Sequence, residues 1–180
     1  MTGLASFNLM QWIDDNRDLL RPPVLNQTIF KDSDFIVQIV GGPNIRTDYH
    51  DDPYEEFFYQ LKGNMVLKVI EDGVMKDVPI NEGGVLLLPA HVPHSPQRPD
   101  PESIGLVVER SRPDSVMDAF EWYCDSCTSR IWRREIQLKS IVADLPPVFE
   151  EYYGTLANGN CTECGHPHPQ KISVSGQGGI

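Results

Sequence analysis

Apolar residues follow two different periods along the chain, first that of a helix and then that of strands. Helical spacing links Leu9, Trp12, Ile13, Asn16, Leu19 and Leu20, and the pattern stops at Arg21-Pro22-Pro23. From residue 28 to residue 110, short apolar runs alternate with Gly, Pro or Asp-Gly, which predicts strands over 35–40, 56–61, 64–71, 75–80, 84–88 and 104–110. Such evenly spaced short strands are typical of an all-β closed barrel or sandwich with few helices.

The chain beyond residue 110 carries weaker signals. We predict helices over 115–120 and 146–153, the second ending at Gly154, which is a natural C-terminal stop. Asp72-Gly73 has the form of a hairpin turn. With 180 residues and no internal repeat, the chain is expected to form a single domain over 1–180, with a barrel core over about 28–112, an extension over about 113–171 and a Ser- and Gly-rich flexible tail over 172–180.

Composition and charge narrow the class of partner. The formal net charge is −11 and the 15 Lys and Arg residues are scattered, so we expect no nucleic-acid partner and no membrane partner. The segment from Met1 to Met10 lacks the basic and apolar regions of a signal peptide, and no apolar stretch approaches the roughly 18 residues of a membrane span. These features predict a cytoplasmic protein.

Two glycine-framed segments carry residues that can bind a metal. The segments are Gly42-x5-Asp48-x-His50-x5-Glu56-x6-Gly63 and Gly83-x5-Pro89-x-His91-x2-His94-x3-Arg98. Two imidazoles and one carboxylate suit a divalent first-row metal, and three ligands on one face leave positions where substrate and O2 can bind to ferrous iron. The spacing therefore predicts oxygen chemistry at an iron centre.

The carboxylate ligand must be chosen among neighbours. Strand alternation places Asp48 on the same face as His50, where it could orient that imidazole. Alternation cannot continue through Pro53, so it leaves Glu55 and Glu56 open as ligands. The motif spacing favours Glu56.

The second histidine ligand also has a neighbour of the same type. Pro93 separates His91 from His94, so both could face inward, and the motif spacing favours His94. We expect His91 to lie beside the ligands or at the surface. For Asp51 and Asp52 we expect a solvated acidic loop.

A second set of candidate ligands is Cys124-x2-Cys127-x33-Cys161-x2-Cys164. Two Cys-x-x-Cys pairs supply four thiolates, the ligands of a tetrahedral zinc site or a rubredoxin-like iron site. Disulfides are the alternative, but a cytoplasmic chain favours metal. Because a four-thiolate site has no vacant position, we expect it to be structural. His166 and His168 lie just beyond the last Cys and could substitute as ligands.

The two glycine-framed segments resemble the signature motifs of the cupin superfamily, which are small antiparallel β-barrels. Here Asp48 stands where the general pattern has its first His, His91 replaces a Gly, and Arg98 replaces an Asn. The strings GGPNIRTDYH (41–50), EEFFYQ (55–60) and HSPQRP (94–99) are similar to the 3-hydroxyanthranilate 3,4-dioxygenase family, and the likeness runs from about Trp12 to the second cysteine pair. The resemblance implies a double-stranded β-helix, or jelly-roll-like, cupin barrel.

The resemblance also implies a reaction and a metal. The family opens the ring of 3-hydroxyanthranilate with O2 to give 2-amino-3-carboxymuconate semialdehyde, which closes without enzyme to quinolinate, a precursor of NAD in the kynurenine pathway. By the resemblance, His50, Glu56 and His94 hold Fe(II). Bacterial and fungal members carry a second iron or zinc at the four cysteines and form homodimers, which the resemblance implies here too.

Four further residues receive roles from the resemblance. Arg98 would grip the substrate carboxylate with paired hydrogen bonds, and Glu109 would hold Arg98 or meet the substrate amine. Arg46 and Asn26 occupy the positions of the family's oxygen-side residues, where a cation and an amide can stabilise developing negative charge. Without the motif, Arg46 and Arg98 would be read as surface salt-bridge residues.

Two other functions remain open at this point. Another cupin dioxygenase, acting on a different aminophenol or on a thiol, would keep the ligands, but Arg98 and Glu109 together suit a substrate with a carboxylate. A non-catalytic cupin that senses a metal or a small molecule would need an output module, and the sequence shows none.

Overall fold

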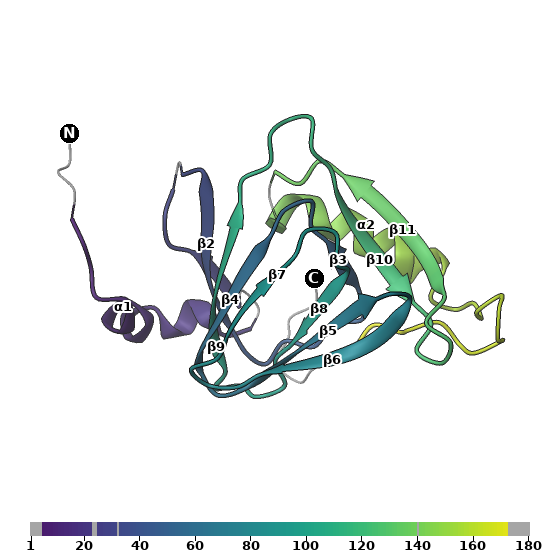
Figure 1. The fold of residues 1–180 in the computed structure, drawn as a ribbon, viewed down its shortest axis with the longest axis horizontal. Helices are drawn as coiled ribbons and strands as arrows, with labels where there is room; N and C mark the ends of the chain where they lie inside the picture. Colours follow the sequence, from purple (N-terminus) through teal and green to yellow (C-terminus); the bar gives the residue numbers. More distant parts are fainter. Residues whose placement is uncertain (1–4, 23–24, 32, 140, 173–180) are drawn as a thin grey trace.

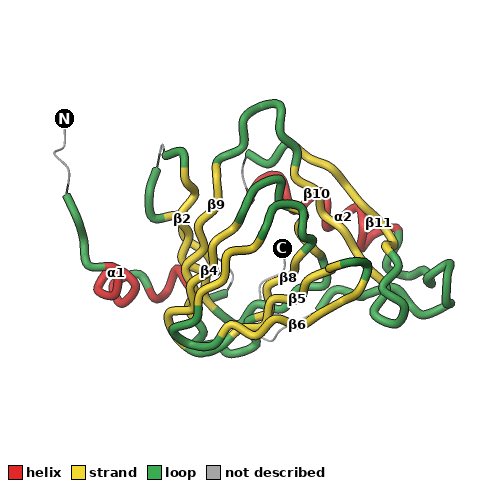
Figure 2. Tube along the Cα trace, viewed as in Figure 1, coloured by secondary structure: helices red, strands yellow, loops and turns green. Residues whose placement is uncertain are grey.

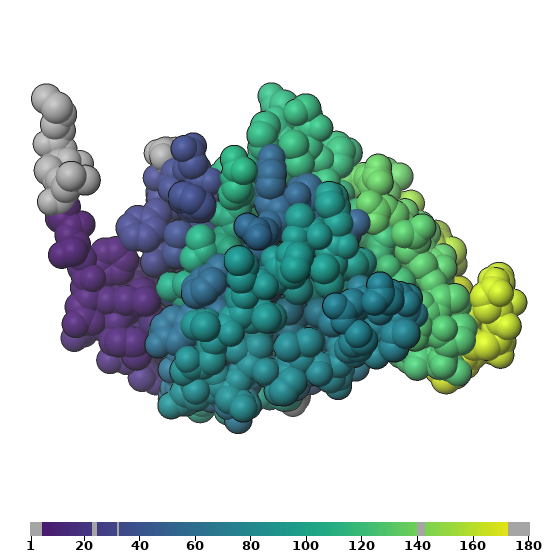
Figure 3. Space-filling model, in the orientation of Figure 1, coloured from purple at the N-terminus to yellow at the C-terminus, as the bar shows by residue number. Residues whose placement is uncertain are grey.

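The computed structural model describes residues 5–22, 25–31, 33–139 and 141–172. Two antiparallel sheets lie face to face, with a helix toward either end of the molecule (Figure 1). Strands and the loops between them make up most of the chain (Figure 2). The N-terminal segment and the C-terminal loop of the described chain lie at opposite ends of the long axis (Figure 3). This confirms the predicted all-β architecture with few helices.

The first sheet has five strands. Their spatial order is β1 (Asn26–Thr28), β2 (Phe35–Gly41), β9 (Ile104–Arg110), β4 (Glu56–Lys62) and β7 (Val85–Leu88). β9 pairs with β2 on one side and with β4 on the other. Because Phe57 pairs with Val108, Glu56 and Glu109 lie one position further along these two neighbouring strands.

The second sheet has six strands. Their order is β11 (Arg130–Ile136), β10 (Asp118–Tyr123), β3 (Tyr49–Asp51), β8 (His94–Gln97), β5 (Met65–Glu71) and β6 (Val74–Ile80). β5 and β6 form the predicted hairpin, since Asp72 and Gly73 both have positive φ, at 52° and 74°, as a two-residue type I′ turn requires. β8 lies between β3 and β5, which places His94 directly opposite His50.

The main apolar core fills the space between the sheets. Phe58 and Val107 of the first sheet pack against Met65, Leu67 and Ile80 of the second. Each such buried side chain contributes on the order of 1.5–3 kcal/mol. β4 contributes Phe58 to this core, and β8 pairs with β5, which contributes Met65 and Leu67. β4 and β8 carry two of the candidate metal ligands.

Two helices cover the ends of this sandwich. α1 (Leu9–Asp15) begins at Asn8, whose side chain caps the backbone N–H of Gln11, and is followed by a 3-10 turn over Arg17–Leu20. Ile13 and Leu20 pack on Ile39 of β2.

α2 (Ile141–Thr155) packs its apolar face on β10. Tyr152 stacks on Trp122 with ring centroids 4.1 Å apart. Among the described residues, no helix combines the length and the apolar character that a membrane span needs.

The sequence predicted six strands at their correct places and failed in the region after residue 110. The predicted helix over 115–120 is wrong, because Asp118–Tyr123 forms β10. All six residues of β10 are buried, so the alternation of apolar and polar residues that marks a half-exposed strand is missing. The helix predicted over 146–153 is confirmed, although it begins at Ile141. Residues 173–180 of the predicted tail lie outside the described residues.

Candidate active site

The three candidate metal ligands come from both sheets and converge between them. His50 on β3 and His94 on β8 belong to the six-stranded sheet, and Glu56 begins β4 of the five-stranded sheet. One ligand atom from each lies within 4.8 Å of the others. The rings of His50 and His94 have centroids 5.2 Å apart. The predicted ligands are thus brought together in the interior of the barrel.

The protonation of His94 fits a metal at this point. Its Nδ1 lies 3.0 Å from the carbonyl oxygen of Val92, which can only accept, so the proton sits on Nδ1 and Nε2 carries a lone pair. Nε2 is 2.7 Å from Glu56 Oε2, yet that oxygen is buried without a hydrogen-bond partner. When His94 is neutral, two acceptor atoms lie this close together, and a bound cation would satisfy both. Burial works to raise the pKa of Glu56, but the positive charges around it, that of Arg112 among them, lower it.

His50 is oriented by a carboxylate that the sequence did not identify. Its Nε2 lies 2.7 Å from Asp118 Oδ2 on β10, and its ring stacks on Phe120 with centroids 4.9 Å apart. Burial works to lower the pKa of His50, but the bond to Asp118 and the nearby negative charges raise it. The sequence pattern predicts this orienting role for Asp48. Asp118 takes it instead, and Asp48 pairs with Arg46.

Arg98 is a buried cation that has no carboxylate partner among the described residues. Its side chain is 1% exposed, and its Nη1 donates to Gln60 Oε1 at 2.8 Å and contacts Met65 Sδ at 2.7 Å. Its Nε has no hydrogen-bond partner. Burial lowers the pKa of Arg98 to about 10, and only the more distant charge of Glu56 opposes this. Leaving such a donor unsatisfied costs about 1–3 kcal/mol, a cost that a bound anion would remove.

Two neighbours fix the orientation of Arg98. Gln60 donates from Nε2 to the Lys62 carbonyl at 2.7 Å and to Ser103 Oγ at 2.9 Å, which leaves its Oε1 directed at Arg98. Gly105 on β9 lies against the guanidinium, since a Cβ there would be 2.5 Å from Arg98 Nη2. With Nη1 occupied by Gln60, the Nε edge of Arg98 is the one left for a ligand.

Glu109 lies beside the metal ligands but is held by Arg112, not by Arg98. Nη1 of Arg112 donates to Glu109 Oε2. Burial and the charge of Glu56 raise the pKa of Glu109 to about 7, while Arg112 opposes the shift. The same contacts raise the pKa of Arg112. A raised pKa of Glu109 and a raised pKa of Arg112 are compatible, because Arg112 divides its charge among several carboxylates. The resemblance predicts that Glu109 holds Arg98 or meets the substrate amine. Because Glu109 bonds to Arg112, it does not hold Arg98.

The two oxygen-side candidates are placed differently. Arg46 precedes β3, donates from Nε to Asp48 Oδ1 at 3.2 Å and pairs through Nη2 with Oδ2. Burial works against its charge, but Asp48 raises the pKa of Arg46, and the charge of Glu56 acts in the same direction. Asn26 lies on the edge strand β1 opposite Val40. Within the described part of the chain, no side-chain hydrogen bond ties Asn26 to the other candidates.

The remaining histidines lie outside the group of barrel ligands. His91 has a side chain that is 67% exposed and lies 3.1 Å from Asp51, in agreement with the expected surface position. His166 is exposed, and Nδ1 of His168 bonds to the carbonyl of Leu156 at 2.7 Å. Neither of these two belongs to the four-cysteine ligand group.

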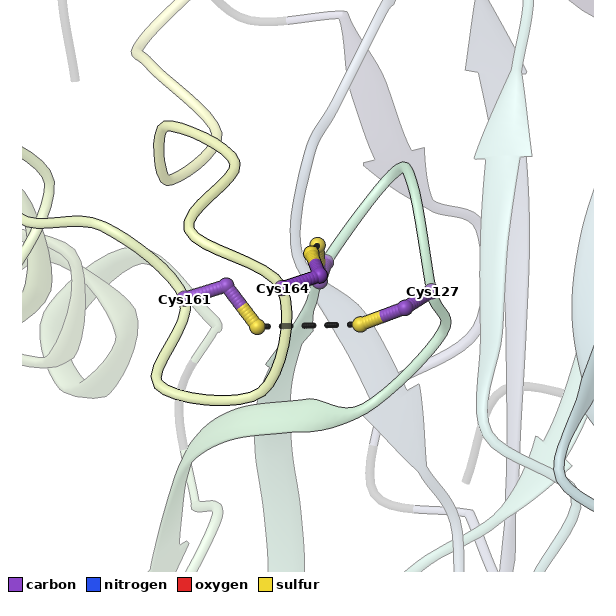
Figure 4. A group of neighbouring side chains, drawn as sticks. Cys127, Cys161 and Cys164 are labelled. Carbon is purple, nitrogen blue, oxygen red and sulfur yellow. Dashed lines mark hydrogen bonds between the residues drawn. The ribbon is translucent and has the colours of Figure 1, made fainter.

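The four cysteines form a second, separate ligand group. Their sulfur atoms lie within 4.8 Å of one another, and none forms a disulfide. Cys127 lies 3.6 Å from Cys161 (Figure 4), and Cys124 lies 3.5 Å from Cys164, so each contact joins one pair to the other. The hydroxyl of Ser129 contacts Cys127 and Cys161 at 2.9 and 3.2 Å. The arrangement fits a four-thiolate metal site.

Sequence reasoning missed the charged residues that surround the barrel ligands. Asp52 is 2% exposed and Asp51 is 8% exposed, so the expected solvated acidic loop is wrong. Arg133 reaches Asp51 at 2.7 Å, and Arg112 reaches Asp52 at 2.6 Å. These partners follow the acidic residues by some 60 to 82 positions, and no motif spacing links them.

Comparison with known proteins shows which family the chain is similar to. A model of the 3-hydroxyanthranilic acid dioxygenase family matches residues 1–153. A 3-hydroxyanthranilate 3,4-dioxygenase of Paraburkholderia phytofirmans is 58% identical over 165 residues, which cover 92% of this chain and 95% of the relative. One of Ruegeria pomeroyi is 56% identical over 176 residues, covering 98% of each.

A solved cupin-2 domain protein of Shewanella frigidimarina is similar in structure, with a TM-score of 0.45 and 16% identity over 54% of this chain and 91% of that one. The sequence resemblance is confirmed by the family model and by the relatives, which span nearly the whole chain. The chain belongs to the 3-hydroxyanthranilic acid dioxygenase family.

Proposed function

We propose that this protein converts 3-hydroxyanthranilate and O2 to 2-amino-3-carboxymuconate semialdehyde, the precursor of quinolinate and of NAD in the kynurenine pathway. The observation that carries the proposal is Arg98, a buried guanidinium with an unsatisfied Nε and no carboxylate partner, next to a group of metal ligands. An aminophenol without a carboxylate, or a simple thiol, would leave that charge unpaired. The relatives are named 3-hydroxyanthranilate 3,4-dioxygenase, which supports the substrate and the type of reaction.

His50, Glu56 and His94 fit Fe(II), and we assign that metal to them. The donor set is two imidazoles and one carboxylate, with Glu56 Oε2 unsatisfied and a lone pair on His94 Nε2. Ferrous iron bound there would supply open coordination positions and the electron transfer that O2 activation requires. The protein holds these ligands on strands of both sheets, so their positions are fixed by the barrel.

The other site residues bind and orient the substrate. The free Nε edge of Arg98 would take the substrate carboxylate with two parallel hydrogen bonds, because a guanidinium matches that planar group. Glu109 would meet the substrate amine. With a pKa close to 7 it can hold or release a proton near neutral pH, so it can accept one from the bound aminophenol. Arg46 and Asn26 would lie on the oxygen side, with Arg46 oriented by Asp48.

The proposal extends to the rest of the protein. The four cysteines would hold a structural iron or zinc. We further propose that the chain is a single domain that acts as a homodimer in the cytoplasm, with no nucleic-acid or membrane partner.

Anaerobic loading with Fe(II) tests the function directly. We expect that metal-stripped protein, loaded with Fe(II) and given 3-hydroxyanthranilate and then air, forms the near-ultraviolet band of the ring-opened product. Mass spectrometry with isotopically labelled O2 should show both oxygen atoms in that product. Unloaded protein serves as the control. Folded, iron-loaded protein that binds 3-hydroxyanthranilate and forms no ring-opened product would refute the proposal.

A further inference from the structure

Arg112 contacts three buried carboxylates at the edge of the metal site. It lies between β9 and β10, and its side chain is 1% exposed. Its Nε and Nη2 donate to Asp118 at 2.8–3.1 Å, and its Nη2 also reaches Asp52 at 2.6 Å. Its Nη1 donates to Glu109 and, at 2.8 Å, to the carbonyl of Arg110. One planar group thus fixes three acidic side chains relative to one another.

Two of these carboxylates connect Arg112 to the candidate active site. Asp118 bonds to the ligand His50 at 2.7 Å, and Glu109 lies next to the ligand Glu56 on neighbouring strands. Arg112 itself is not a ligand, and it reaches the metal group only through these partners. A shift of its guanidinium would therefore move His50 and Glu109 together.

The same carboxylates form a competing group of potential metal ligands. Ligand atoms of His50, Asp52 and Asp118 lie within 4.8 Å of one another, and His50 is shared with the Glu56–His94 group. Arg112 contacts both aspartates of this second group. A fixed cation bonded to their oxygens supplies the positive charge that a metal would otherwise bring, and it occupies lone pairs that a metal would need.

We propose that Arg112 is a positioning residue that determines which ligands receive the metal. Its hydrogen bonds occupy the oxygen atoms of Asp52 and Asp118, so that His50 binds the metal together with Glu56 and His94. Arg112 also holds Glu109 toward the substrate. This inference rests on the proposed metal group of His50, Glu56 and His94. A purely structural role would be to neutralise buried acids, with no effect on the coordination of a metal.

Cobalt(II) gives a readout that does not depend on turnover, because its visible spectrum reports the number and type of ligands. We expect Arg112→Met and Arg112→Lys to alter the Co(II) spectrum of the barrel site and to weaken binding of Co(II) by Glu56 and His94 about 10- to 100-fold, as losses of outer-shell partners do. Lysine keeps the charge and so favours folding, but it cannot span all three carboxylates.

Glu56→Gln, made with and without Arg112→Met, tests whether the metal changes its ligands when Arg112 is lost. With Arg112 present, Glu56→Gln should remove most Co(II) binding in the barrel. With Arg112→Met, we expect Glu56→Gln to cost at least tenfold less, because the freed Asp52 and Asp118 can replace the lost ligand beside His50. Arg133→Lys is the matched control, because Arg133 also contacts two buried acids, Asp51 and Glu121. This substitution should lower the stability of the protein without changing the Co(II) spectrum.

The possible results separate this inference from the proposed function. A wild-type Co(II) spectrum and affinity in folded Arg112→Lys protein would overturn the role of Arg112, and this variant decides the matter if Arg112→Met does not fold. An unchanged penalty for Glu56→Gln in the Arg112→Met protein would overturn the choice of ligands. Retention of barrel Co(II) by His94→Ala with Arg112 intact would instead refute the metal group on which both proposals rest.

Discussion

The two ligand groups of this molecule differ in whether their buried polar atoms already have partners within the protein. In the barrel, Glu56 Oε2 and Arg98 Nε are buried without a hydrogen-bond partner. Among the cysteines, Cys127 and Cys161 contact each other and Ser129, and Cys124 contacts Cys164. An unsatisfied buried polar atom costs about 1–3 kcal/mol. The barrel group therefore carries a cost in stability that ligands would remove.

The four-cysteine group connects segments that are distant in the chain. Its first pair follows β10 and its second pair follows α2, so a metal bound there would join the edge of the six-stranded sheet to the C-terminal loop. The barrel group, in contrast, is assembled from strands that already hydrogen-bond to their neighbours. We propose that the cysteine group serves stability and that the barrel group serves binding and catalysis, a division that the following predictions test.

The largest expected effect is the loss of turnover on removal of a barrel ligand. In His50→Ala, Glu56→Ala or His94→Ala protein, we expect no measurable turnover and loss of the barrel metal, with the metal of the four cysteines retained, because three ligands are the minimum set. Metal analysis and turnover assays check this. Any of these variants with full iron content and normal activity would show that the replaced residue is not a ligand.

The opposite pattern is expected for the cysteines. Cys124→Ser should lower the free energy of unfolding by at least about 3 kcal/mol, since structural zinc supplies about 10–16 kcal/mol in zinc-finger peptides. Turnover per bound barrel iron in the folded fraction should stay within about twofold of wild type. Denaturant unfolding and turnover normalised to iron measure the two quantities. Soluble, folded Cys124→Ser protein that keeps its iron and loses all turnover would contradict the structural role.

A smaller effect is expected from pH. Burial and Glu56 raise the pKa of Glu109 to about 7 from an ordinary 4.5, so the folded state holds this proton more tightly than the unfolded state. The stabilisation is present at low pH and is lost as pH rises from about 4.5 through 7. In protein whose barrel metal has been removed, we expect Glu109 to account for a fall of about 1–3 kcal/mol in unfolding free energy over that range. Glu109→Gln should remove this part of the fall, and equal slopes in the two proteins would exclude Glu109 as its source.

The sequence predicted those parts of the molecule that depend on local patterns. The strand β4 and the hairpin at Asp72-Gly73 follow from alternation and turn chemistry, and the ligands His50, Glu56 and His94 follow from motif spacing. The short strands β3 and β8, with three and four residues, carry too little alternation to be recognised.

The charged network around the ligands could not be predicted in the same way. Asp118 bonds to His50 across 68 positions, and Arg112 reaches Asp52 across 60. Such pairs are set by the order of strands in the sheet and leave no periodic signal in the sequence. A helix was predicted in place of β10 for a related reason, because its Asp118 and Glu121 are fully buried by partners outside the strand, such as His50 for Asp118 and Arg133 for Glu121.

The most direct test of the central claim compares two ligands at Arg98. 3-Hydroxyanthranilate carries the carboxylate that Arg98 is proposed to bind, and 2-aminophenol lacks it. Charge-assisted hydrogen bonds are worth about 1.5–3 kcal/mol, so Arg98→Ala should weaken the binding of 3-hydroxyanthranilate on the order of tenfold to a few hundredfold. The binding of 2-aminophenol should weaken less than about threefold. Anaerobic dissociation constants measure both effects. Arg98→Lys should restore only part of the loss, since it lacks the paired geometry. An equal loss for both ligands would show that Arg98 does not bind the carboxylate, and would contradict the proposed substrate.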